Sequence, residues 1–231
     1  MKKFFLFAAA IATAMTINAQ AEYGQLVTFG DEAVAKGPWS NGYVWEGELI
    51  DVTIFDENEK AEIDLNQAYF GNAEAYTAYE SRLKSGGKTD AKGLHIEVDA
   101  WEKGTLYIMV RTGSNSATDR NLVVSQNNQE LFNQVIEEAN AIEVEMDCES
   151  CEGGKQMKKV YPVIALDVEK GNINVSFPTG SLNFYAFAFD AEGDQAVNNV
   201  EATVKAVKTF ENGQLVIVKN GVKYNALGAK L

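Results

Sequence analysis

The sequence predicts an all-β fold: an antiparallel β-sandwich followed by a short C-terminal β-hairpin. Three observations support this class. Short runs rich in β-branched and aromatic residues recur along the chain, bounded by Gly, Asn, Asp or Pro. Several of these runs alternate with a period of two. Short turns at 101–104 and 168–171 join strong runs at hairpin spacing, and strands do not alternate with helices.

The predicted strands follow one another through most of the chain. They lie at 24–29, 48–55, 93–100, 104–111, 121–126, 141–146, 161–168, 171–177 and 182–189. Two other segments are ambiguous. Residues 129–142 have apolar residues at helical spacing, which predicts either a short helix or a bent connection between strands. Residues 75–87 are interpreted as a loop that leads into a strand.

Alternation within two runs predicts which residues share a face. In 171–177, Ile173, Val175 and Phe177 share one face, as in a strand that lies on a core. In 182–189 large and small residues alternate, so both faces can be buried and we expect a central strand. Its predicted faces are Phe184, Ala186 and Ala188 on one side and Tyr185, Phe187 and Phe189 on the other.

The N-terminus has the pattern of a secretory signal peptide. Lys2 and Lys3 precede an apolar stretch that reaches about Met15, and a small-x-small site follows at 19–21. The apolar run is shorter than the roughly 20 residues of a membrane-spanning helix, so we expect cleavage and no transmembrane segment. The predicted organisation is a signal peptide at 1–21, a β-sandwich at 22–196, and a linker with a C-terminal hairpin at 197–231. We expect a secreted or cell-surface protein.

Charge is distributed unevenly along the chain. The formal net charge is −13, but the five lysines and one glutamate of residues 205–231 give this tail +4. Without the tail and the two signal-peptide lysines, the body carries −19. Such a body repels nucleic acid and disfavours anionic lipid or densely anionic polysaccharide. Neutral glycans, cations and basic partners stay open, as does a simple role of the charge in solubility.

Cys148 and Cys151 form a C-x-x-C motif. A redox site is disfavoured because the surrounding acidic residues favour the neutral thiol, and zinc lacks ligands because the chain offers two Cys and one His. In an oxidising compartment we expect a disulfide that closes a loop tip. His95 is interpreted as a half-exposed strand residue, since no nucleophile motif accompanies it.

The carboxylates are numerous and identify no catalytic residue. Glycosidase chemistry requires two carboxylates at a defined separation, which a sequence does not show. Residues 56–67 resemble a calcium loop but place Ala61 at the glycine position and Gln67 at the closing glutamate position. No cofactor is predicted, and a structural calcium ion held by loop carboxylates and carbonyls stays open.

Aromatic residues in irregular segments are candidates for sugar binding. Trp39, Tyr43 and Trp45 lie in a Gly-rich stretch, and Trp101 lies in a predicted hairpin turn. The C–H face of a pyranose stacks on such rings while its hydroxyls bond to neighbouring polar groups. The alternative is that Trp39 and Trp45 close the open end of the sandwich, because large aromatics are mostly buried.

Residues 79–124 resemble a β-sandwich module of secreted Bacteroidetes proteins, often found beside pectate lyase or pectinesterase domains. The matching pieces are "RLKSGG", "KGTLYI", "RTGSNSATDR" and "NLVV", with "KGNINVSFPTGSLNFYAFAF" farther on. The resemblance implies a galactose-binding-type jelly roll that binds carbohydrate. Arg111 and Arg120 flank the "RTGSNSATDR" loop, and each can pair with acidic residues or reach ligand hydroxyls.

The tail resembles the C-terminal sorting domains of the type IX secretion pathway of the same bacteria. "NGQLVIVKNGVKYNALGAKL" matches their glycine-punctuated strands, with an Asn220–Gly221 turn and Gly228 near the end. Asn-Gly favours a type I′ hairpin because both residues accept positive φ. The resemblance implies that the secretion machinery binds residues 205–231; a shortened remnant is the alternative.

The predicted function is non-catalytic carbohydrate binding at the outer membrane or outside the cell. A second hypothesis is a structural or protein-interaction surface protein whose aromatic residues belong to the core. A third is a polysaccharide lyase or hydrolase with carboxylates that the sequence does not identify.

Overall fold

The computed structural model of the chain describes residues 23–29, 41–89, 94–148, 150, 151, 153–193, 207–211, 214–219 and 222–225. The predicted signal peptide, Trp39, the Asn220–Gly221 turn and Gly228 lie outside these residues. The chain forms two compact units, Met1–Glu192 and Gly193–Leu231, and each is described by itself. Within the described ranges, no helix is long and apolar enough to cross a membrane.

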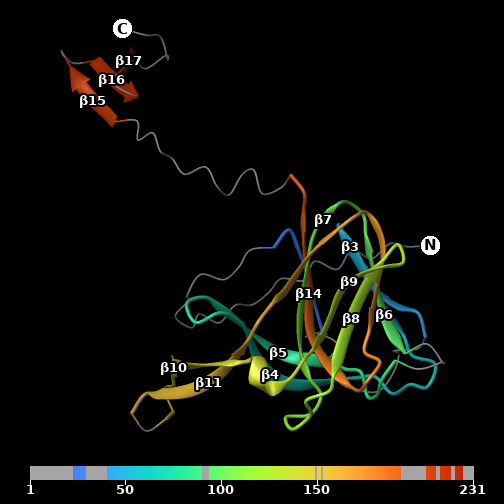
Figure 1. Cartoon of the computed structure of the whole chain (residues 1–231). Coiled ribbons are helices and arrows are strands. Elements are labelled where there is room, and N and C mark those ends of the chain that lie inside the picture. Colours follow the sequence, from blue (N-terminus) through green and yellow to red (C-terminus); the bar gives the residue numbers. More distant parts are fainter. Residues whose placement is uncertain are drawn as a thin grey trace, which may run out of the picture. The chain divides into compact units, whose positions relative to one another are not determined.

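The first unit is a β-sandwich of two sheets, which confirms the predicted fold class (Figure 1). The eight-stranded sheet has the order β10-β11-β4-β5-β14-β7-β12, with β1 also paired to β14. The six-stranded sheet has the order β2-β3-β6-β13-β8-β9. Pairing is antiparallel except between β11 and β4 among the described strands. The strands are β1 Gln25–Thr28, β2 Tyr43–Trp45, β3 Ile50–Phe55, β4 Glu62–Gly71, β5 Tyr76–Lys84, β6 His95–Ala100, β7 Gly104–Thr112, β8 Asn121–Gln126, β9 Gln129–Val135, β10 Ile142–Asp147, β11 Lys155–Tyr161, β12 Ile164–Val168, β13 Gly171–Ser176 and β14 Leu182–Ala191.

The main core lies between the two sheets. The prediction for β13 is confirmed, because Ile173, Val175 and Phe177 are buried in this core. β14 is a central strand with both faces buried, also as expected. The predicted division of its faces is wrong. The register with β7 shifts between Phe184 and Ala186, so this β-bulge reverses the alternation.

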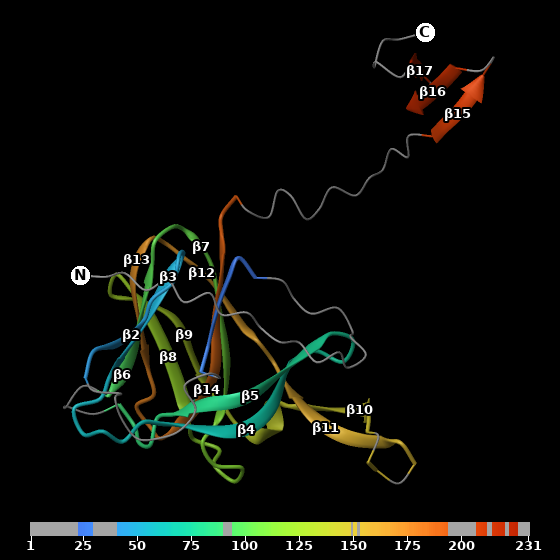
Figure 2. The ribbon, with the colours of Figure 1, turned by 180° about the vertical axis from the view of Figure 1, so that it is seen from behind.

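A second hydrophobic cluster forms on the other side of β14. Phe184, Phe187 and Phe189 belong to the main core, whereas Tyr185, Ala186 and Ala188 belong to the second cluster. β7 is divided in the same way, with Leu106, Ile108 and Val110 in the core and Met109 in the second cluster. Strands β4, β5 and β11 supply the remaining large residues, namely Phe70, Tyr79 and Tyr161. Strand β14 is therefore covered on both faces. In Figure 2, β4 and β5 cross the lower end of β14.

The segments that the sequence left ambiguous are mainly strands. Residues 76–84 form β5 rather than a loop, and 129–135 form β9, followed by the 3₁₀ turn η1 (Glu138–Asn140). The β8–β9 register shifts between Val124 and Ser125, and the adjacent Leu131 and Phe132 both pack against the core. Two consecutive inward residues at a bulge imitate the apolar spacing of a helix.

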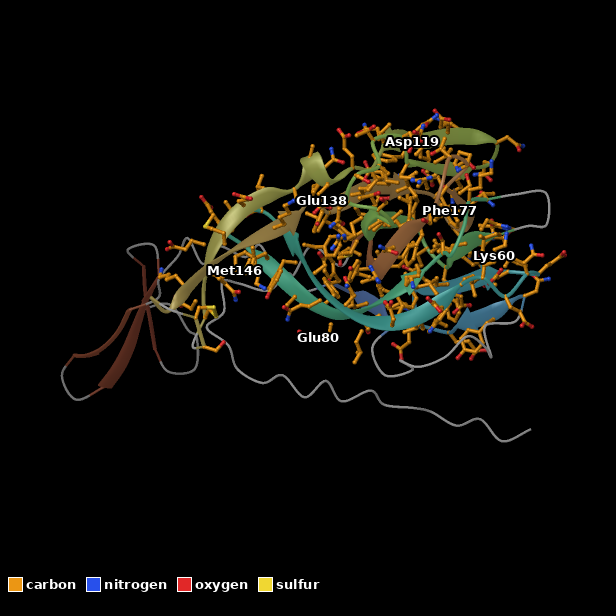
Figure 3. All side chains as sticks on the ribbon, turned by 90° about the horizontal axis from the view of Figure 1, so that it is seen from below. Lys60, Glu80, Asp119, Glu138, Met146 and Phe177 are labelled. Atoms are coloured by element: carbon orange, nitrogen blue, oxygen red, sulfur yellow. A yellow bond between two sulfur atoms is a disulfide. The ribbon has the colours of Figure 1, made fainter. Side chains whose placement is uncertain are left out.

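Strands β10 and β11 form a two-stranded arm with a disulfide at its tip. Their ladder runs from the Ile142–Val160 pair to the Asp147–Lys155 pair. Figure 3 shows Glu138 where the arm begins and Met146 farther along it, away from Phe177 in the sandwich. Cys148 and Cys151 are disulfide-bonded, with Cα atoms 5.3 Å apart, as predicted.

The second unit contains a three-stranded antiparallel sheet, β15-β16-β17. Its strands are Val207–Glu211, Gln214–Lys219 and Val222–Asn225. The last two pair as the predicted hairpin, and β15 adds a strand that the sequence analysis did not identify.

Candidate carbohydrate-binding face

Tyr43 and Trp45 lie on β2, at the edge of the six-stranded sheet. Both are partly buried and pack against the main core. The Trp45 ring meets Phe29 edge-on with centroids 5.0 Å apart, and Tyr43 lies 4.9 Å from Trp45 in the same manner. The packing of Trp45 is compatible with the alternative in which Trp39 and Trp45 close the open end of the sandwich; Trp39 itself lies outside the described residues.

Trp101 has a different environment. It follows β6 directly, and its side chain is 43% exposed although it is large and apolar. Its backbone N–H donates to the carbonyl of Leu49 at 2.9 Å, which fixes the turn that carries the ring. Three of the four aromatic candidates are described by the structure, and of these three Trp101 is the exposed one.

Arg111 is held by protein groups. Its Nη2 donates to Asn115 Oδ1 at 2.8 Å and lies 3.6 Å from Glu138 Oε2. Its guanidinium also lies over the Tyr161 ring, 5.0 Å from the centroid. Lys159 and the Tyr161 hydroxyl donate to Glu138 Oε1 at 3.1 and 2.9 Å. Burial raises the pKa of Glu138, but these hydrogen bonds and the charge of Arg111 outweigh it, so the pKa is lowered.

Arg120 is held by the loop between β13 and β14. Its Nη1 donates to the Thr179 carbonyl at 3.0 Å, and its Nε lies 3.6 Å from Asp119 Oδ1. Gly180 lies directly against the guanidinium, because a Cβ there would be 1.5 Å from Nη1. Both arginines therefore have structural contacts, one at the base of the arm and one at a loop.

A polar face on the six-stranded sheet was not identified from the sequence. We call it the outer face and define it by the side chains of β3, β6 and β13 that alternate with the buried ones. These are Asp51, Thr53, Phe55, His95, Glu97, Asp99, Asn172, Asn174 and Ser176. The strand registers align Thr53, Glu97 and Asn174 in one row across the three strands. Carboxylates and amides from separate parts of the chain are thus neighbours on one surface.

Glu97 lies at the centre of the outer face. Its Oε2 accepts a hydrogen bond from Asn172 Nδ2 at 2.9 Å, and its Oε1 lies 3.3 Å from His95 Nε2. The His95 ring stacks on Phe55, with centroids 4.6 Å apart and planes 7° from parallel. These contacts orient polar groups that remain partly accessible to solvent.

The outer face is acidic. Asp51 and Asp99 are direct cross-strand partners, an arrangement in which like charges repel. None of the nine side chains that define this face is Lys or Arg. Lys103, near Trp101 in sequence, pairs with Glu169 and Glu192 at 3.6 and 3.1 Å. The face is therefore suited to ligands without negative charge.

The loop that resembles a calcium site begins at Asp56, which is buried. Asp56 Oδ2 accepts a hydrogen bond from the N–H of Ala61 at 2.7 Å. In the part of the chain that the structure describes, no group of three His, Cys, Asp or Glu side chains could hold a metal ion.

Comparison with known proteins adds little to this picture. No family model and no curated protein matches the chain. Among solved structures, it aligns with a cleaved adhesin domain of Lys-gingipain from Porphyromonas gingivalis, at 10% identity. The alignment covers 74% of this chain and 100% of that domain, with a TM-score of 0.31. A likeness at this level carries no inference about function.

Proposed function

We propose that the protein is a secreted, non-catalytic carbohydrate-binding β-sandwich whose glycan lies on the outer face beside Trp101. One observation carries the proposal. The side chains of Glu97, Asp99 and Asn172 lie near the end of β6, and the exposed indole of Trp101 directly follows that strand. Hydroxyls of a sugar bond to such groups, and its C–H face stacks on an aromatic ring. Binding a sugar in this way requires no catalytic residue in the protein.

The test is a glycan array followed by calorimetry with the mature chain. We expect binding to at least one non-acidic glycan, weakened about tenfold or more by Trp101→Ala or Asn174→Ala. Leu65→Ala is the matched control, since Leu65 is a 73% exposed apolar residue on the other sheet. Absence of binding across the array, or equal loss in the control, would contradict the proposal.

Export is the second part of the proposal. The signal-peptide pattern directs the chain out of the cytoplasm, and the tail at 205–231 is an address for the secretion machinery. The Cys148–Cys151 disulfide fits an oxidising compartment. A reporter fused to residues 205–231 should reach the cell surface more efficiently than the same reporter without them. Equal display would refute the role of the tail.

A structural or protein-interaction role is the second candidate. It is favoured by the packing of Tyr43 and Trp45 against the core, because that packing removes two rings from the predicted sugar site. The same array separates the two functions, since a protein without a glycan ligand gives no signal with any sugar.

A further inference from the structure

Aromatic residues lie at both ends of β6 on the outer face. At the start of the strand, the rings of Phe55 and His95 are stacked. Trp101 follows its end, and its N–H donates to the Leu49 carbonyl, one pair beyond the Ile50–Ala100 pair of the β3–β6 ladder. Because the pairing continues in register, Trp101 falls on the same side as Asp99. A rise of about 3.3 Å per residue separates the two aromatic positions by about 20 Å. Glu97 and Asp99 lie between them on the same side.

The described strands leave this strip uncovered. Every described strand of the first unit belongs to one of the two sheets, so no third layer of described strands covers it. Asp99 and Asn172 are exposed, and Glu97 and Asn174 are half-buried. The eight-stranded sheet differs, because Phe70, Tyr79 and Tyr161 cover its outer side at β14. An open strip accommodates the interior of a long chain, whereas capture of a single terminal sugar calls for a closed pocket.

The charge of the strip restricts the chain that fits. Asp51 and Asp99 face each other across β3 and β6, and Glu97 follows in the next outward position. A uronic acid polymer would bring further carboxylates against these groups and would be repelled. A chain of neutral hexoses or pentoses offers hydroxyls that donate to the carboxylates and accept from Asn172 and Asn174.

We infer that the ligand is a linear, non-acidic polysaccharide whose interior lies along β6, from the Phe55–His95 stack to Trp101. This inference rests on the proposed function and specifies it. The rings act as two separate stacking positions, and the carboxylates and amides between them hold the intervening sugars. Affinity then depends on whether one ligand spans both positions.

The experiment measures dissociation constants by calorimetry for unbranched β-1,4-linked glucose, xylose and mannose oligosaccharides of two and six sugars. In the series that binds, we expect the hexamer to bind at least tenfold more tightly than the dimer. Trp101→Ala and Phe55→Leu should each reduce the affinity for the hexamer about tenfold and so remove most of the gain with length. Leu65→Ala should leave both affinities within twofold. A galacturonic acid hexamer should not bind.

The possible outcomes separate the inference from the proposed function. Equal affinity for dimer and hexamer would overturn the inference while leaving carbohydrate binding intact. Binding of the galacturonic acid hexamer as tightly as the neutral one would overturn the assignment of a non-acidic ligand. No binding in any of the three neutral series would overturn the inference, and the proposed function falls with it where the glycan array also gives no signal. Thermal unfolding of each variant shows whether a lost affinity reflects a lost fold.

Discussion

The stability of the base of the β10–β11 arm depends on the carboxylate of Glu138, and the substitution Glu138→Gln tests this dependence. Glu138 and Arg111 are only 16% and 14% exposed, and Glu138 also accepts hydrogen bonds from Lys159 and Tyr161. Hydrogen bonds to charged groups contribute about 1.5–3 kcal/mol each, and glutamine retains a neutral acceptor. Allowing for solvent screening, we expect the free energy of unfolding to fall by about 2 kcal/mol. At about 2–4 °C per kcal/mol for a domain of this size, Tm falls by about 4–8 °C.

The assay is thermal and urea unfolding of the mature chain, with hydrogen exchange of β10 and β11 as a local readout. Because the pKa of Glu138 is lowered on folding, its stabilisation is present above the ordinary glutamate value of about 4.3 and is lost as pH falls through the folded value. The difference in unfolding free energy between wild type and E138Q should therefore be full at pH 7 and should narrow as pH falls below about 4.3. Glu143→Gln, at an exposed position of β10, is the matched control. A gap below about 0.5 kcal/mol at pH 7, or one independent of pH, would refute the reasoning.

Three further substitutions test the packing. Tyr185→Phe removes a hydroxyl that donates to Asn66 Oδ1 at 2.7 Å, and urea unfolding should show a loss of about 1 kcal/mol; no loss would contradict this bond. Gly180→Ala should displace Arg120 from the Thr179 carbonyl at a similar cost, and the loss should shrink in an Arg120→Ala background; full additivity would count against the contact. Serine at both cysteines should change Tm by under about 2 °C because the disulfide closes only the tip of the arm; a larger change would show that the tip stabilises the sandwich.

The sequence predicted the sandwich because strand alternation and turn residues are local signals. It missed what depends on pairing. β4 was not recognised because its register with β5 shifts between Leu65 and Ala68, which interrupts the alternation. The bulge in β14 likewise exchanged Phe184 and Tyr185 between the two predicted faces. A bulge is a relation between two strands, and a single strand sequence does not show it.

The outer face was missed for the same reason. The alternation in β13 already directed Asn172, Asn174 and Ser176 away from the core. That β6 lies beside β13, and that Glu97 therefore meets Asn174, follows only from the sheet order. Trp101, which the sequence placed in a turn, is exposed and stays a candidate. Arg111 and Arg120 share a flexible, cationic side chain with ligand-binding arginines, so only their neighbours reveal structural contacts.

The arm and the outer face belong to different sheets, with the main core between them. Changes at Glu138 and at Trp101 should consequently be independent, since distant sites without shared partners contribute additively. Glu138→Gln should lower Tm and leave glycan affinity within twofold, whereas Trp101→Ala should lower affinity and leave Tm within about 2 °C. Calorimetry and thermal unfolding on the two single variants and the double variant measure both quantities. A loss of glycan affinity in E138Q at temperatures well below its Tm would mean that the arm contributes to the binding site, and the ligand would then have to be placed on the eight-stranded sheet.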